Sequence, residues 1–197
     1  LFRDPLQNLL LFAAVTLLLI ENKSPDAPGH PQIPLRRHAL LLSGLLFGFS
    51  ITVKETMILF CPILTLYIVT SGRSRTRRLI SFLIPVIVCS TVCLLYNYYR
   101  FNHPFDFGYT DKTFQLGLST PLREGLFGLL FSSGRSIFLY NPILLLTLPA
   151  FPVFARLFPR EGWLFSSIIL IQLIFIGKYW TWGGSWAWGP RFLLILV

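Results

Sequence analysis

The residues of this chain best suited to chemistry are a few charged side chains placed beside apolar segments. The carboxylate is Asp4, and the cations are Lys54, Arg135 and Arg191. An ammonium or guanidinium group can hold the oxygens of a phosphate, and a carboxylate can accept a proton or coordinate a metal ion. The pattern predicts a site for a phosphorylated ligand, with Asp4 as a base or metal ligand. For each residue alone, a role as an ordinary charged anchor stays open.

The segment 178–191, KYWTWGGSWAWGPR, is a second candidate because it contains four of the five tryptophans. Aromatic rings form a belt at the level of lipid headgroups, but they also stack on the apolar C–H faces of sugars. The glycines and the proline between these rings specify a particular backbone path. We therefore expect Trp182 and Trp186 to contact a sugar or a lipid, with a simple aromatic belt as the alternative.

Apolar segments must position these residues, and the composition indicates a membrane. Hydrophobic residues make up 54% of the 197, and charged residues only 13%, against about 25% in soluble domains. Residues 79–99 carry no charge and are long enough for a helix to cross a bilayer. The net charge of +9 comes from short basic clusters between apolar segments, which argues against a nucleic-acid partner. The three cysteines lie in apolar runs and are predicted to be small hydrophobic residues.

Counting the apolar segments predicts an all-α fold, a polytopic transmembrane bundle with about six spans. These segments are 5–20, 39–53, 57–70, 79–99, 136–155 and 163–177, and another begins at Phe192. Residues 125–134 are too few to cross and are predicted to form a re-entrant or interfacial helix. We expect one membrane domain, 1–197, that is part of a longer chain truncated at both ends.

Two features refine the arrangement of residues 39–70. Lys54 and Glu55 interrupt this apolar stretch, and charges at the centre of a bilayer are costly, so we expect a turn between two antiparallel helices. Gly44 and Gly48 form a G-x-x-x-G motif, which predicts close approach of a neighbouring helix.

The distribution of basic residues predicts the orientation. Lys and Arg gather in the connections 21–38, 71–78 and 156–161, which we assign to the cytoplasm. The connections 100–124 and 178–191 then share the outer side, together with Asp4, Lys54 and Arg135.

The order of these motifs resembles that of a known enzyme family. The motifs are RDPLQNLLLF, SGLLFGFSITVKET, YNYYRFNHPFDFGY, GLFGLLFSSGRSIFLYNP and WGGSWAWGPRF. Together they are similar to the middle and C-terminal membrane part of bacterial GT-C glycosyltransferases, which include the protein mannosyltransferase and aminoarabinose transferase groups. The resemblance covers nearly the whole chain, but it consists mostly of patterns of glycine, aromatic and charged residues.

The resemblance implies transfer of a sugar from a polyprenyl-phosphate donor to a protein or glycan acceptor outside the bacterial cytoplasmic membrane. It implies a divalent metal ion, and Asp4 corresponds to a second acidic site, as a metal-binding or acceptor-side carboxylate. Lys54 corresponds to a cation that faces the phosphate, and Arg135 and Arg191 are assigned the same role by inference. The main catalytic aspartate of that family would lie before Leu1, so we expect this piece to be inactive alone. Two alternatives stay open: a transporter or flippase for a lipid-linked glycan, and a non-catalytic polytopic membrane protein.

Overall fold

The computed structural model describes residues 3–22, 35–70, 75–108 and 117–183. Within these ranges the regular elements are eight α-helices and one 3₁₀ helix, with no strand. The predicted all-α fold is therefore confirmed for the part of the chain described. The chain forms two compact units, residues 1–108 and 109–197, and each is considered by itself.

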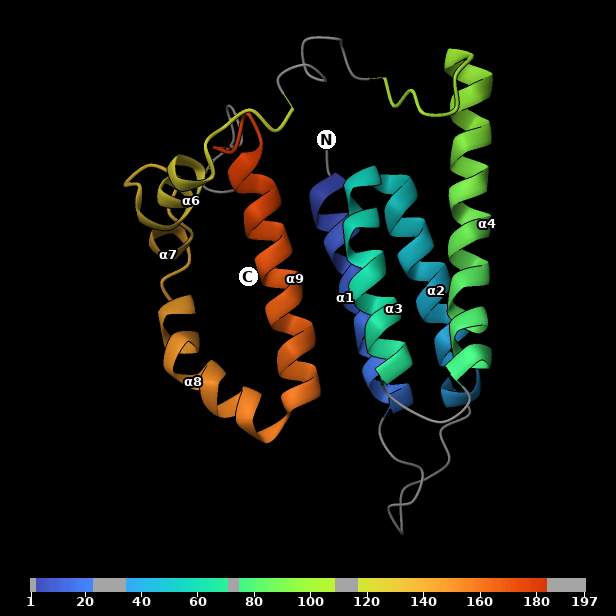
Figure 1. Ribbon diagram of the computed structural model, residues 1–197, viewed down its shortest axis with the longest axis horizontal. Helices are drawn as coiled ribbons and strands as arrows, with labels where there is room; N and C mark the ends of the chain where they lie inside the picture. The colour runs from blue at the N-terminus through green and yellow to red at the C-terminus, as the bar shows by residue number, and fades with distance from the viewer. Residues whose placement is uncertain (1–2, 23–34, 71–74, 109–116, 184–197) are drawn as a thin grey trace. The chain divides into compact units, whose positions relative to one another are not determined.

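The first unit is a bundle of helices that lie side by side, and helices that follow one another along the chain run antiparallel (Figure 1). Its elements are α1 (Arg3–Asn22), α2 (Leu35–Val53), the 3₁₀ helix η1 (Glu55–Phe60), α3 (Cys61–Thr70) and α4 (Arg75–Phe101). Because α1 buries Leu11, Ala14, Val15 and Leu18, which recur at helical spacing, one face of this helix packs into the bundle.

The predicted turn at Lys54 is confirmed. Lys54 has extended backbone angles, φ −153° and ψ 115°, and lies between the end of α2 and the start of η1. Its N–H still donates to the carbonyl of Ser50 at 3.0 Å, and its own carbonyl accepts from the N–H of Met57 at 3.1 Å. The chain therefore reverses direction at the charged residues instead of carrying them through the middle of one long helix.

The G-x-x-x-G motif of α2 packs against α4, as predicted. A Cβ atom added to Gly44 would lie 2.2 Å from the carbonyl oxygen of Phe82, and one added to Gly48 would lie 2.9 Å from the Cβ of Cys89. Phe47 stacks on Phe82 with 5.9 Å between ring centroids. The two glycines thus allow a backbone approach that any larger residue would prevent.

The second unit contains α6 (Leu122–Phe131), α7 (Ile137–Tyr140), α8 (Leu144–Leu157) and α9 (Pro159–Lys178). Helix α9 packs against both α6 and α8. A small core forms where Leu129, Ile137 and Ile176 meet, with Trp182 packed against them. Helices α6 and α9 approach closely at Gly125, because a Cβ added there would lie 1.8 Å from the carbonyl oxygen of Gly177.

The six predicted spans are supported only in part. Among the described residues, three helices are long and apolar enough to cross a membrane: α1, α4 and α9. The apolar helices 38–53, 55–70 and 144–157 are shorter. The short helix expected within 125–134 is present as α6, ending at Phe131.

The predicted continuous span 136–155 is wrong, because this segment is divided between α7 and α8. The chain leaves helical geometry at Asn141, with φ −137° and ψ 73°. Pro142 follows, and a proline disfavours the helical region for the residue before it while lacking an N–H of its own. The mostly apolar composition of residues 136–155 had favoured one continuous span. The expected start of a span at Phe192 lies outside the described residues.

Candidate functional site

Asp4 and Lys54, which are 50 residues apart in sequence, form an ion pair at one end of the first unit. The Lys54 Nζ donates to Asp4 Oδ1 at 2.8 Å. Asp4 stands in the first turn of α1, where the positive end of the helix dipole favours a carboxylate. Lys54 is delivered by the break between α2 and η1. Asp4 of α1 and Lys54 of the turn before η1 thus come from separate elements and meet in one ion pair.

The surroundings strengthen this pair. The side chains are only 20% exposed at Lys54 and 15% exposed at Asp4, and attraction between opposite charges grows as water is excluded. The ammonium can donate up to three hydrogen bonds, one of which goes to Asp4. Chemically, the pair presents a held cation that can meet the oxygens of an anionic group.

Two amide side chains extend this polar end of α1, and sequence reasoning missed them. Gln7 and Asn8 follow Asp4 by three and four residues, so all three share one side of the helix. Gln7 is only 3% exposed. Its Oε1 and the Asn8 Oδ1 are buried and have no hydrogen-bond donor among the described residues. The signal available in the sequence was their helical spacing from Asp4.

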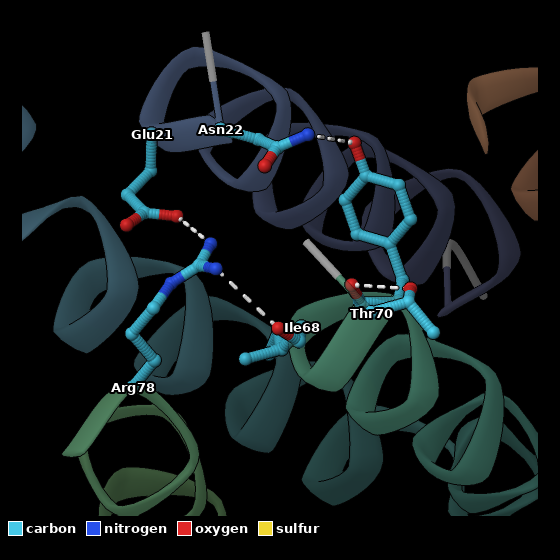
Figure 2. Close-up of polar contacts among 6 residues, drawn as sticks. Glu21, Asn22, Ile68, Thr70 and Arg78 are labelled. Atoms are coloured by element: carbon cyan, nitrogen blue, oxygen red, sulfur yellow. Dashed lines mark hydrogen bonds and ion pairs between the residues drawn. The ribbon is translucent and has the colours of Figure 1, made fainter. Parts of the chain in front are cut away.

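The opposite end of the first unit is closed by a second polar cluster, shown in Figure 2. The Arg78 guanidinium of α4 forms an ion pair with Glu21 of α1 and donates to the carbonyl of Ile68 at 3.4 Å. Nearby, the Asn22 side chain donates to the Tyr67 hydroxyl at 3.1 Å. These contacts connect α1, α3 and α4. In the sequence, Arg78 counted only as part of the basic cluster 71–78 that indicates orientation. In the structure, Arg78 connects α4 to α1 and α3.

Arg135 lies in a tight turn of the second unit, after α6. The Ser136 hydroxyl donates to the carbonyl of Leu130 at 2.6 Å, and the Tyr140 hydroxyl donates to the carbonyl of Gly134 at 3.2 Å. The polar side chains around Arg135 therefore stabilise the turn itself. The Arg135 side chain passes beside Gly183, since a Cβ there would lie 3.7 Å from its Nε. The structure brings Arg135 and the start of the aromatic segment together.

Trp182 packs inward in the second unit. Its ring atom Cη2 would lie 2.1 Å from a Cβ added to Gly128, and the indole contacts the core around Leu129 and Ile176. This contact gives Trp182 a packing role that sequence reasoning did not anticipate, while its contact with a sugar stays a prediction. Trp186 and Arg191 lie outside the described residues.

The connections 100–124 and 178–191 were predicted to share one side of the membrane, and three hydrogen bonds join the described parts of them that belong to the second unit. The N–H and hydroxyl of Thr120 donate to the carbonyls of Lys178 at 3.2 Å and Tyr179 at 3.1 Å. The N–H of Trp180 donates to the carbonyl of Gly117 at 2.9 Å. Residues 117–120 and 178–180 therefore lie at the same end of the second unit. Which side of a membrane they face stays a prediction.

The metal expected at Asp4 finds no complete ligand set in the described ranges. There, no three His, Cys, Asp or Glu side chains gather as metal ligands would, and the Lys54 ammonium contacts Asp4 Oδ1. A divalent metal ion at Asp4 therefore stays a prediction. The three cysteines are free and partly buried in helices, consistent with small hydrophobic packing groups.

No family model, curated protein or solved structure matches this chain. The class that its fold defines is a helical protein with helices suited to a membrane. Within this class, the Asp4–Lys54 pair and the Arg135 turn are the candidate sites, each in its own unit.

Proposed function

We propose that this chain is part of a multi-pass glycosyltransferase of the bacterial cytoplasmic membrane. It would move a hexose or pentose from a polyprenyl-phosphate donor to an acceptor on the outer face. The observation that carries the proposal is the Asp4–Lys54 pair. A lysine held by a carboxylate at the end of a helical bundle would be able to bind a phosphate at the membrane surface, while the polyprenyl tail stays in hydrocarbon.

The proposed reaction uses this cation on the leaving group. An acceptor hydroxyl attacks the anomeric carbon of the donor sugar, and the bond from that carbon to the phosphate oxygen breaks. The electron pair leaves with polyprenyl phosphate, whose negative charge Lys54 stabilises. A carboxylate takes the hydroxyl proton; the resemblance places this main base before Leu1. No step is assigned to a metal ion.

Asp4 has a positioning role in this scheme. It fixes the Lys54 ammonium by the 2.8 Å contact and partly neutralises it, so that phosphate can bind and leave. The buried acceptor oxygens of Gln7 and Asn8 continue along the same side of α1. Arg135 and Arg191 are proposed as further phosphate contacts and Trp186 as a sugar contact.

Binding of the proposed donor is the first test. The chain, reconstituted in vesicles, is incubated with a photoactivatable polyprenyl-phosphate sugar that carries a radiolabel in the sugar. We expect saturable labelling that Lys54→Ala lowers at least tenfold, while the exposed control Arg123→Ala, which carries the same loss of charge, does not. Lys54→Arg should retain most of the labelling, which separates loss of charge from misfolding.

Three results decide the proposal. Equal labelling of the Lys54→Ala and parent proteins would remove Lys54 from the site. Absence of saturable labelling would overturn the proposed donor. If the protein is supplied with its upstream sequence and moves the intact labelled lipid between leaflets without releasing polyprenyl phosphate, the transporter alternative is correct instead.

A further inference from the structure

The outward stripe of α4 is a distinct surface of the first unit. Residues at spacings of three, four and seven share one side of a helix, and on α4 the exposed members of this stripe are Arg77, Ile80, Ile84, Val88 and Leu95. The bundle-facing side is the opposite one, where Phe82, Val86 and Asn97 are buried. The exposed tyrosines Tyr98 and Tyr99 flank the far end of the stripe. This surface thus runs from a cation through bulky aliphatic residues to aromatic rings.

This order matches a lipid-facing surface. The rise from Arg77 to Tyr98 is about 32 Å for a helix, close to the roughly 30 Å hydrocarbon core of a bilayer. Arginine and tyrosine would then lie at the two interfaces, and the aliphatic residues between them. The side of α4 that receives α2 differs, because Gly44 and Gly48 of α2 allow close backbone contact there. The stripe therefore suits acyl chains better than a tightly packed helix.

The basic end of the stripe carries exposed positive charge. Arg75 and Arg77 are exposed in the first turn of α4, and neither has an ion-pair partner among the residues that the structure describes. Arg78 differs, since it turns inward to Glu21. Because Arg77 stands in line with the aliphatic residues, a headgroup held there would place its acyl chains along Ile80 and Ile84.

We propose that this surface binds an anionic phospholipid, with the headgroup phosphate at Arg77 and Arg75 and the acyl chains on the α4 stripe. The guanidinium groups donate hydrogen bonds to the phosphate oxygens. Their attraction to a net negative headgroup distinguishes this lipid from a zwitterionic one. The proposal does not depend on sugar transfer.

The test measures lipid selectivity. The 197-residue chain is reconstituted in phosphatidylcholine vesicles that contain spin-labelled phosphatidylglycerol or spin-labelled phosphatidylcholine. Electron spin resonance gives the association constant of each lipid for the protein surface. We expect phosphatidylglycerol to be preferred, and Arg77→Gln to lower this preference about fivefold. Arg77→Lys should retain most of it, and the exposed Arg123→Gln, which makes the same charge change in the second unit, should leave it unchanged.

Three outcomes would overturn the proposal. Equal association of the two lipids with the parent protein would show that the surface does not select a negative headgroup. An unchanged preference in Arg77→Gln would place the selective site elsewhere. Inorganic phosphate is added against chloride at equal ionic strength; if phosphate alone abolishes the preference, the arginines bind free phosphate and the lipid proposal fails.

Discussion

Glu21 and Arg78 form an ion pair across 57 residues of sequence, joining the last turn of α1 to the first turn of α4. Their side chains are 18% and 12% exposed. The Asp4–Lys54 pair lies at the other end of the same bundle. In the described part of the first unit, a charge pair therefore lies at each end, and the helices between the two pairs are mostly apolar.

The Glu21–Arg78 pair should contribute to stability. We expect Arg78→Gln to lower the free energy of unfolding by about 3 kcal/mol, because it removes the guanidinium charge from beside the mostly buried Glu21 carboxylate. The double variant Glu21→Gln, Arg78→Gln should lose less than the sum of the two single variants. Unfolding in mixed micelles measures these values. Strict additivity would mean that the two side chains do not interact.

Gly44 should be intolerant of substitution. A Cβ at this position meets the carbonyl oxygen of Phe82 at 2.2 Å, so α2 and α4 would have to separate. We expect Gly44→Ala to destabilise the protein by about 1–3 kcal/mol. Gly134→Ala is the matched control, because nothing lies within 4 Å of its added Cβ. The midpoint of thermal unfolding in detergent should fall for the first variant only.

Gly128 and Trp182 should be coupled in the second unit. An alanine at residue 128 collides with the indole ring, whose Cη2 would lie 2.1 Å from the new Cβ. Gly128→Ala should therefore be destabilising, and adding Trp182→Ala should relieve the collision. A double-mutant cycle should give a coupling of about 1–3 kcal/mol. No coupling would contradict the packing of Trp182 against α6.

The sequence predicted those features that depend on charge and residue size. The cost of placing Lys54 and Glu55 in hydrocarbon predicted the chain reversal, and the spacing of Gly44 and Gly48 predicted close packing. The mostly apolar composition of residues 136–155 suggested one span, although Asn141 followed by Pro142 is a turn signal that the sequence does carry. Composition could not show which charges pair, since Arg78 and Glu21 meet only after three helices have packed. Trp182 packs inward because Gly128 leaves room for its ring. The sequence alone does not show that these two residues face each other.

The orientation of the first unit is the prediction on which the proposed outer site depends. Phe105, after α4, and Arg75, at its start, are both exposed and lie at opposite ends of this 27-residue helix. In a background with Cys61, Cys89 and Cys93 replaced by alanine, we expect Phe105→Cys to react with a membrane-impermeant maleimide added to intact cells. Arg75→Cys should react only after the membrane is permeabilised, because the basic cluster around it favours the cytoplasm. The reverse pattern would place the end of α4 at Phe105 inside the cell. Since α2 and α4 run in the same direction, Lys54 and its partner Asp4 would then also face the cytoplasm, where the proposed outer-face transfer could not occur.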